Sequence, residues 1–257
     1  MGLDPAALNA LDRRGYVVLE AIAHAGLQSA QTHARPNAFV CIDGKTYWLK
    51  SNAQQGLVAE LIAGRLAARV GAGPMAEIIR LTREALPPGG IADHLMGVVV
   101  GSEDHPGTVN ARDLQPFISG GTFDAGLIDP VSGARVIVFQ TWLGLGDTQV
   151  LIRIADGRVL SIDHGDCFGA TGTHSDPTVV VTSIPGVPDN VGKEWKYVEP
   201  AVGLIETIND KVLLESVARV PGGEPWRSPV DRRIQIADWL AHRRGRLREV
   251  MRTWTRT

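Results

Sequence analysis

The stretch Val159–Phe168, VLSIDHGDCF, is mostly apolar until it reaches an aspartate, a histidine and a glycine. A short apolar run of this kind predicts a buried β-strand. Its end would place the Asp163 carboxylate at the mouth of a cleft, and Gly165 is expected to let the backbone turn there. A carboxylate in that position suits Mg²⁺, which prefers hard oxygen ligands. Asp-x-Gly after a strand is also an ordinary turn, so the stretch alone leaves both interpretations open.

This strand is expected to be the second arm of a hairpin. The run VLIRI (150–154) precedes it, and Asp156-Gly157 between the two runs is a typical hairpin turn, because a type I′ turn needs two residues with positive φ. Closing the hairpin would bring the Gln149 amide oxygen near Asp163. With phosphate oxygens, these two ligands would suffice for Mg²⁺. The alternative is a strand-initial glutamine without a partner.

The first hundred residues predict an antiparallel sheet and one helix. Residues 57–70 place apolar side chains on one helical face and are followed by Gly71, a common helix end. Asp43-Gly44 marks a second hairpin. The last predicted strand ends in a polar turn, GSED (101–104). Five runs predict strands: 16–22, 38–42, 46–50, 76–84 and 97–104.

The middle of the chain gives a less regular pattern. Residues 105–135 show little periodicity, with short helical turns expected around Leu114–Ile118. An apolar run at 136–143 follows, and the segment 136–165 is expected to contain the hairpin with the chemically important loops.

The last part of the chain predicts helices at roughly 200–218 and 230–252. Strands first, a hairpin in the middle and helices last indicate an α+β fold. We therefore expect a β-rich N-terminal lobe over 1–104 and a helix-rich C-terminal lobe over 105–257, with a cleft between them.

Composition narrows the class of protein. The chain has 257 residues, of which 44% are apolar and 21% charged, with a formal net charge of −2. These values are typical of an ordinary globular protein, and nucleic acid is not an expected partner. No apolar run reaches about 18 residues, so a membrane-spanning protein is not expected. Cys41 and Cys167 lie far apart and the N-terminus lacks a secretory signal pattern, which favours a cytoplasmic location.

The C-terminal segment is strongly basic. Residues 227–257 hold nine arginines and three acidic residues. One interpretation is a helix that binds an anionic partner. The other is a terminal helix with a basic solvent face, because its apolar residues form a plausible buried stripe. That stripe consists of Ile234, Trp239, Leu240, Leu247, Val250 and Met251.

Lys50 and Glu60 form a second candidate feature. Lys50 ends a predicted strand, and Glu60 lies on the helix that follows, so an ion pair between them is sterically reasonable. A lysine held in this way can present its ammonium group to a phosphate. The alternative is an ordinary surface lysine.

Four stretches resemble the HipA-like kinase domain, a branch of the protein-kinase-like superfamily. The resemblance covers roughly residues 16–252. It implies a bilobal kinase fold that uses ATP and Mg²⁺ and transfers the γ-phosphoryl group to a protein hydroxyl or a small-molecule acceptor. The stretches are YWLK (47–50), LVAELIAGRLA (57–67), FQTWLGLGDTQVLI (139–152) and VLSIDHG (159–165).

The resemblance implies a role for each matching residue. Lys50 would contact the α- and β-phosphates, and Glu60 would orient Lys50. Asp163 would bind Mg²⁺, with Gln149 as a second metal ligand. Asp147 would be the catalytic base that accepts the proton of the acceptor hydroxyl.

The resemblance also places the remaining nucleotide contacts. The loop at 26–37 stands where a phosphate-covering loop belongs; it lacks the G-x-G-x-x-G pattern, but Ser29 and Thr32 could donate to phosphate. The polar turn at 101–104, which includes Glu103, falls where a hinge would meet adenine through backbone groups.

One loop departs from the family pattern and opens alternatives. The family has Asp-Arg followed by an asparagine, whereas this chain has a shorter loop with Asp147, Thr148 and Gln149. A metal ligand displaced by about 1 Å can cost on the order of a hundredfold in rate. A degenerate kinase-fold module that binds without phosphoryl transfer is therefore the second hypothesis. A lipid or inositide kinase is the third, since SIDHG (161–165) is similar to that group's strand-Asp-x-Gly.

Other constellations fit less well. His164, Cys167 and His174 lie near Asp163 and Asp166 and suggest a zinc site, but their spacing matches no standard zinc pattern. Cys167 with a histidine could form a nucleophile pair, although a single cysteine is more often a buried apolar residue. The absence of P-loop, dinucleotide-binding and G-x-S-x-G motifs argues against those enzyme classes.

Overall fold

The structure is a computed structural model. It describes residues 2–28, 37–50, 56–86, 96–114, 125–145, 148–168, 180–181, 187, 191–223 and 226–257.

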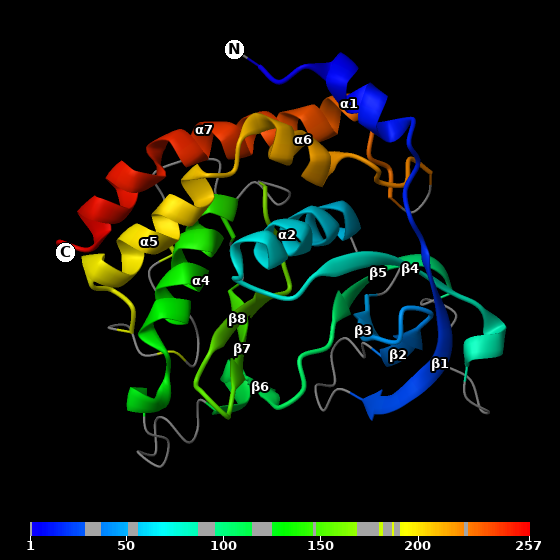
Figure 1. Ribbon diagram of the computed structural model, residues 1–257, viewed down its shortest axis with the longest axis horizontal. Helices are drawn as coiled ribbons and strands as arrows, with labels where there is room; N and C mark the ends of the chain where they lie inside the picture. The colour runs from blue at the N-terminus through cyan, green and yellow to red at the C-terminus, as the bar shows by residue number, and fades with distance from the viewer. Residues whose placement is uncertain are drawn as a thin grey trace.

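A five-stranded barrel forms the N-terminal part of the fold (Figure 1). Neighbouring strands are antiparallel except β1 and β4, which run parallel. Buried apolar side chains, among them Phe39, Leu49, Ile79 and Val99, fill its interior. The five predicted strands are therefore confirmed, with shifted ends. They are β1 (Leu19–Gln28), β2 (Asn37–Cys41), β3 (Thr46–Leu49), β4 (Ala76–Leu81) and β5 (Gly97–Glu103).

The predicted helix at 57–70 is confirmed as α2 (Leu57–Val70). It packs against β4 and β5 on one side and against the C-terminal helices on the other, so it joins the barrel to the rest of the core (Figure 1). Gly71 ends the helix with φ +66°, a conformation that glycine adopts without strain. The sequence did not predict the first helix, α1 (Pro5–Asp12), which Asp4 caps.

The middle of the chain differs from the expectation. Residues 136–143 are the end of a helix, α4 (Pro130–Leu143), so the hairpin occupies less than the expected segment 136–165. The run is buried on nearly all sides, and such a helix shows no amphipathic period that would distinguish it from a buried strand. Within Leu114–Ile118, only Leu114 is described, and it is helical together with residues 111–113.

The hairpin itself is confirmed. β7 (Gln149–Arg153) pairs antiparallel with β8 (Val159–Ile162), with Gln149 opposite Ile162. A short strand that the sequence did not predict, β6 (Thr108–Asn110), completes a three-stranded sheet. This pairing places Gln149 and the residue after β8 at the same end of the sheet, and the Asp156-Gly157 turn at the other end.

Three helices complete the fold: α5 (Trp195–Glu206), α6 (Asp210–Val217) and α7 (Val230–Trp254). They lie along one side of the molecule, with α2 between α6 and the barrel and α4 between α5 and β8 (Figure 1). The segment predicted as one helix at 200–218 is two helices, because Asn209 caps the second. No helix in the described ranges combines the length and the apolar character that crossing a lipid bilayer requires.

Several arginines of α7 hold the C-terminal helices together. Buried Arg233 pairs with Asp12 of α1, and buried Arg243 donates to the Trp142 carbonyl of α4 at 3.0 Å. Two more arginines form ion pairs, Arg244 with Asp210 and Arg248 with Glu199 and Glu206. These contacts favour a structural basic helix over a surface that binds an anionic partner.

Candidate functional site

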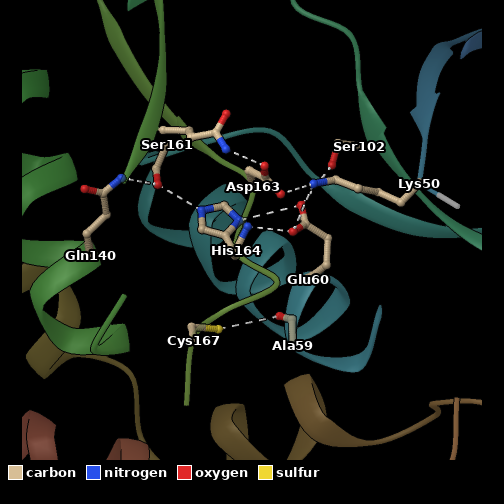
Figure 2. Close-up of polar contacts among 10 residues, drawn as sticks. Lys50, Ala59, Glu60, Ser102, Gln140, Ser161, Asp163, His164 and Cys167 are labelled. Carbon is tan, nitrogen blue, oxygen red and sulfur yellow. Dashed lines mark hydrogen bonds and ion pairs between the residues drawn. The ribbon is translucent and has the colours of Figure 1, made fainter. Parts of the chain in front are cut away.

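Three charged side chains from separate elements meet at one point. Lys50 follows β3, Glu60 lies in the first turn of α2, and Asp163 follows β8 (Figure 2). Lys50 Nζ lies 3.4 Å from Glu60 Oε2, and it forms a closer ion pair with Asp163 Oδ1. The predicted Lys50–Glu60 ion pair is therefore confirmed, and the strand lysine and the hairpin carboxylate share one site.

The three charges stabilise one another. Burial alone would lower the pKa of Lys50, but the Glu60 and Asp163 carboxylates outweigh this effect and raise it. Burial alone would raise the pKa of Asp163, but the ammonium group of Lys50 outweighs it and lowers that pKa. Both groups are therefore ionised at neutral pH. The Asp163 side chain is 42% exposed, so its carboxylate is accessible to a ligand from solvent.

The backbone at Asp163 corrects one expectation from the sequence. Asp163 itself has φ +58°, whereas Gly165 is not among the described residues with positive φ. Aspartate tolerates this left-handed conformation better than most residues. The close packing requires a glycine at position 56 instead: a Cβ atom on Gly56, directly before α2, would lie 2.4 Å from the Gly165 carbonyl oxygen. Gly56 thus lets the loop after β8 approach the start of α2.

Gln149 lies beside Asp163, as the hairpin register predicts. Its Nε2 donates a hydrogen bond of 2.6 Å to Asp163 Oδ2. Rotating the amide by half a turn would present its oxygen to the same place. Asp163 and Gln149 thus offer one carboxylate and one amide. Proteins bind Mg²⁺ with a few oxygen ligands of this kind when phosphates supply the remaining ones. The site thus fits Mg²⁺.

The zinc and cysteine alternatives find no support in the described ranges. No group of three or more His, Cys, Asp or Glu residues is arranged there to hold a metal ion, and His174 lies outside them. Cys167 is fully buried, and burial raises the pKa of its thiol well above the ordinary value. A thiol in this environment stays protonated and is not a nucleophile.

His164 is a site residue whose place sequence reasoning missed. Its backbone N–H donates to Glu60 Oε2 at 2.6 Å, and its ring Nε2 lies 2.9 Å from Ser161 Oγ (Figure 2). Gln140 Nε2 donates to the same hydroxyl at 2.9 Å, so the Ser161 hydroxyl hydrogen can point to the ring. The ring Nδ1 faces Glu60 Oε1 at 3.9 Å and is buried without a hydrogen-bond partner among the described residues. His164 thereby ties Glu60 to β8 and α4.

His164 should make stability depend on pH. Burial lowers its pKa, although Glu60 acts in the opposite direction, so the folded chain binds this proton less readily than the unfolded chain does. The stabilisation is complete above the unfolded pKa of about 6.5 and falls as the pH drops below it, by up to about 1.4 kcal/mol per pH unit. We expect urea unfolding at pH 7.5 and 5.5 to show a smaller pH effect in His164→Asn. His242→Asn, which changes an exposed histidine of α7, should retain the wild-type effect. Equal pH effects in both variants would contradict this role.

Of the remaining predicted site residues, Glu103 is described and the others are not. The prediction of a polar turn at 101–104 is wrong, because residues 101–103 continue β5. The Glu103 backbone N–H donates to the Met75 carbonyl at 2.9 Å, and its carboxylate accepts from Lys45 at 3.0 Å. Three other predictions lie outside the described residues: Ser29, Thr32 and Asp147.

No protein-family model and no curated protein matches this sequence. Among solved structures, the chain is similar to the proinflammatory kinase CtkA of Helicobacter pylori. The TM-score is 0.54 and the identity 11%, over 93% of this chain and 98% of that chain. The fold is protein-kinase-like. A Golgi casein kinase with Mn/ADP bound gives a TM-score of 0.45 at 9% identity, over 96% of this chain and 77% of that chain. The resemblance to the HipA-like branch stays a prediction.

Proposed function

We propose that this chain is an ATP- and Mg²⁺-dependent phosphotransferase of the HipA-like kinase type. The observation that carries the proposal is the meeting of Lys50, Glu60 and Asp163 in a chain with a kinase-like fold. Phosphoryl transfer needs little covalent chemistry from the protein; it needs charges held in place around a triphosphate. A lysine held between two carboxylates from different elements supplies such charges.

In this proposal the nucleotide lies between two lobes, 1–104 and 105–257. Lys50 and Glu60 come from the first lobe, and Asp163 and Gln149 from the second. Lys50 would exchange its contact with Asp163 for the α- and β-phosphates, and Glu60, which His164 holds in place, would keep Lys50 oriented. Bound Mg²⁺ would neutralise charge on the β- and γ-phosphates.

The roles of the other predicted site residues are assigned from their positions in the chain. Asp163, freed from Lys50, would hold the metal together with the Gln149 amide oxygen. Asp147, two residues before β7, would accept the proton of the acceptor hydroxyl. Ser29 and Thr32 would donate to phosphate, and adenine would lie beside the end of β5 at Glu103, where it would meet backbone groups. The Glu103 backbone N–H is engaged with Met75, so it is not one of these groups.

A kinase-fold module that binds without transfer is the second candidate, and one observation favours it. Both carboxylate oxygens of Asp163 are engaged within the chain, one by Lys50 and the other by Gln149. A site whose metal ligand is held by internal contacts needs rearrangement before it can act. The loop with Asp147, Thr148 and Gln149, which lacks the arginine and asparagine of the family, points the same way.

Autophosphorylation with radiolabelled ATP separates the two candidates. We expect the wild-type chain to incorporate label only when Mg²⁺ is present. Asp147→Asn should lower the rate about a hundredfold, because a positioned general base contributes at least this factor. Nucleotide binding without incorporation or ATP turnover would favour the module, and an unchanged rate in Asp147→Asn would show that Asp147 is not the base.

A further inference from the structure

A hollow of about 590 Å³ lies beside the start of α4, away from the site described above. Its walls come from the 3₁₀ turn η3 (Ala125–Leu127), from the first turns of α4, and from the turn between β7 and β8. The volume is within the range of pockets that bind ligands. Because Asp163 follows β8 at the opposite end, the hollow and the candidate site lie about 16 Å apart along one hairpin.

The walls of the hollow are held rigidly together. The Asp129 N–H donates to the Gly157 carbonyl at 3.0 Å, and the Val159 N–H donates to Ser132 Oγ at 2.9 Å. A Cβ atom on Gly157 would lie 1.7 Å from the Leu127 carbonyl oxygen, so only glycine allows this approach. The hollow is therefore preformed, which reduces the entropy that a ligand must lose on binding.

Two guanidinium groups in the hollow have no carboxylate of the described residues at ion-pair distance. Arg135 and Arg158 each donate to the Gly71 carbonyl at 3.3 Å, so their positive charges lie close together. Along the described ranges, neither has a carboxylate within ion-pair distance, and Arg135 Nε is buried without a hydrogen-bond partner. One arginine would satisfy the carbonyl at the end of α2, and each guanidinium has five donors. An anion would relieve the repulsion between the two charges.

The acidic residues of the hollow are already engaged. Asp129 caps α4, with its two oxygens accepting from the N–H groups of Val131 and Ser132 at 3.1 Å. Asp156 accepts from Arg153 Nε at 2.8 Å. Asp156 attracts Arg158 but forms its ion pair with Arg153, and both carboxylates would repel a polyanion such as a nucleic acid backbone.

Exposed apolar side chains surround these charges. Leu127 and Val131 line the hollow and are 63% and 44% exposed, and Ile154, 59% exposed, begins the turn between β7 and β8. A free phosphate or sulfate ion would leave these side chains in water. A peptide that carries carboxylates beside an apolar residue would cover them and pair with the arginines.

We propose that this hollow docks a short acidic segment of a partner protein. Its carboxylates bind Arg135 and Arg158 through charge-assisted hydrogen bonds, and a neighbouring apolar side chain rests on Leu127 and Val131. The binding uses no nucleotide, so it is measured independently of phosphoryl transfer.

Fluorescence anisotropy of the full chain with a labelled peptide of alternating glutamate and leucine tests this proposal. We expect saturable binding without nucleotide, and none for the same peptide with glutamine in place of glutamate. Arg135→Gln and Arg158→Gln should each weaken binding about tenfold, since hydrogen bonds to charged groups contribute this much. Leu127→Ser should weaken it about fivefold through lost apolar burial.

Arg246→Gln is the matched control, because it removes the same charge from an exposed position of α7 and should leave binding unchanged. Several results would overturn the proposal. The first is that the wild-type chain shows no saturable binding, and the second is that Arg246→Gln weakens binding as much as the other arginine variants do. The third is that Leu127→Ser binds as the wild type does while sulfate at matched ionic strength competes fully. The fourth is that a single-stranded oligonucleotide binds more tightly than the peptide at the same arginines. Leu127→Ser and the glutamine peptide keep the test decisive if an arginine variant fails to fold.

Discussion

Replacing Asp163 by asparagine is expected to lower Mg²⁺-dependent ATP turnover about a thousandfold, in line with the loss of a preorganised charge at a transition state. The exposed carboxylate of Asp163 is the charged metal ligand that the proposal requires, and asparagine keeps its size without its charge. The fold should persist, because Glu60 still pairs with Lys50 at 3.4 Å. Steady-state phosphate release and a thermal melt of each variant provide the two measurements.

Asp156→Asn is the control for this experiment. Asp156 lies on the turn of the same hairpin, is exposed, and pairs with Arg153. Its replacement changes the same charge away from the proposed metal position and should leave turnover unchanged. Equal losses in the two variants, or full activity in Asp163→Asn, would contradict the assignment of Asp163.

Glu60→Ala is expected to destabilise the chain by about 3 kcal/mol. Glu60 is buried, and its carboxylate accepts from the His164 backbone N–H at 2.6 Å while pairing with Lys50. Alanine would leave this N–H without its partner and weaken the ion-pair network around Lys50. Urea unfolding followed by circular dichroism would measure the change in the free energy of unfolding.

The matched control is Glu20→Ala. Glu20 pairs with Arg80 on the barrel surface, where both side chains are exposed. A pair of this kind contributes at most about 1 kcal/mol, because solvent screens it. A loss in Glu60→Ala no larger than that in Glu20→Ala would show that the Glu60 contacts do not hold the site together.

The elements that position the site were predictable from local signals. Apolar periodicity and the glycine after it define α2, and two Asp-Gly turns define the hairpins. Together with the resemblance, these elements predicted that Lys50, Glu60 and Asp163 would meet. The resemblance supplied the expectation that they share a site. The three residues meet because the barrel packs on α2 and the loop after β8 approaches the start of that helix.

The errors have physical causes that a single sequence does not reveal. α4 is buried on nearly all sides, so its apolar run shows no helical period. α1 has only eight residues, which is too short for a helical period to be evident. The left-handed φ at Asp163 and the contact between Gly56 and Gly165 depend on how closely two elements approach. From local turn preferences alone, the turn after β8 is expected to be made possible by Gly165 rather than by Asp163.

The part played by His164 also required the fold. Its spacing from Ser161 is visible in the sequence, but its contact with Glu60 joins residues 104 positions apart. Near Cys167 and His174 the same histidine suggested a zinc ligand. Only the packing of β8 against α4, together with the approach of the loop after β8 to the start of α2, shows that it supports Glu60.

Isothermal titration calorimetry of ATP tests the central claim most directly, namely that Lys50 and Asp163 hold one triphosphate. We predict that the wild-type chain binds ATP when Mg²⁺ is present and that Lys50→Met weakens this binding at least about tenfold, since a charge-assisted contact to phosphate is lost. Absence of ATP binding with every divalent cation tried, or equal affinity in Lys50→Met, would contradict the claim.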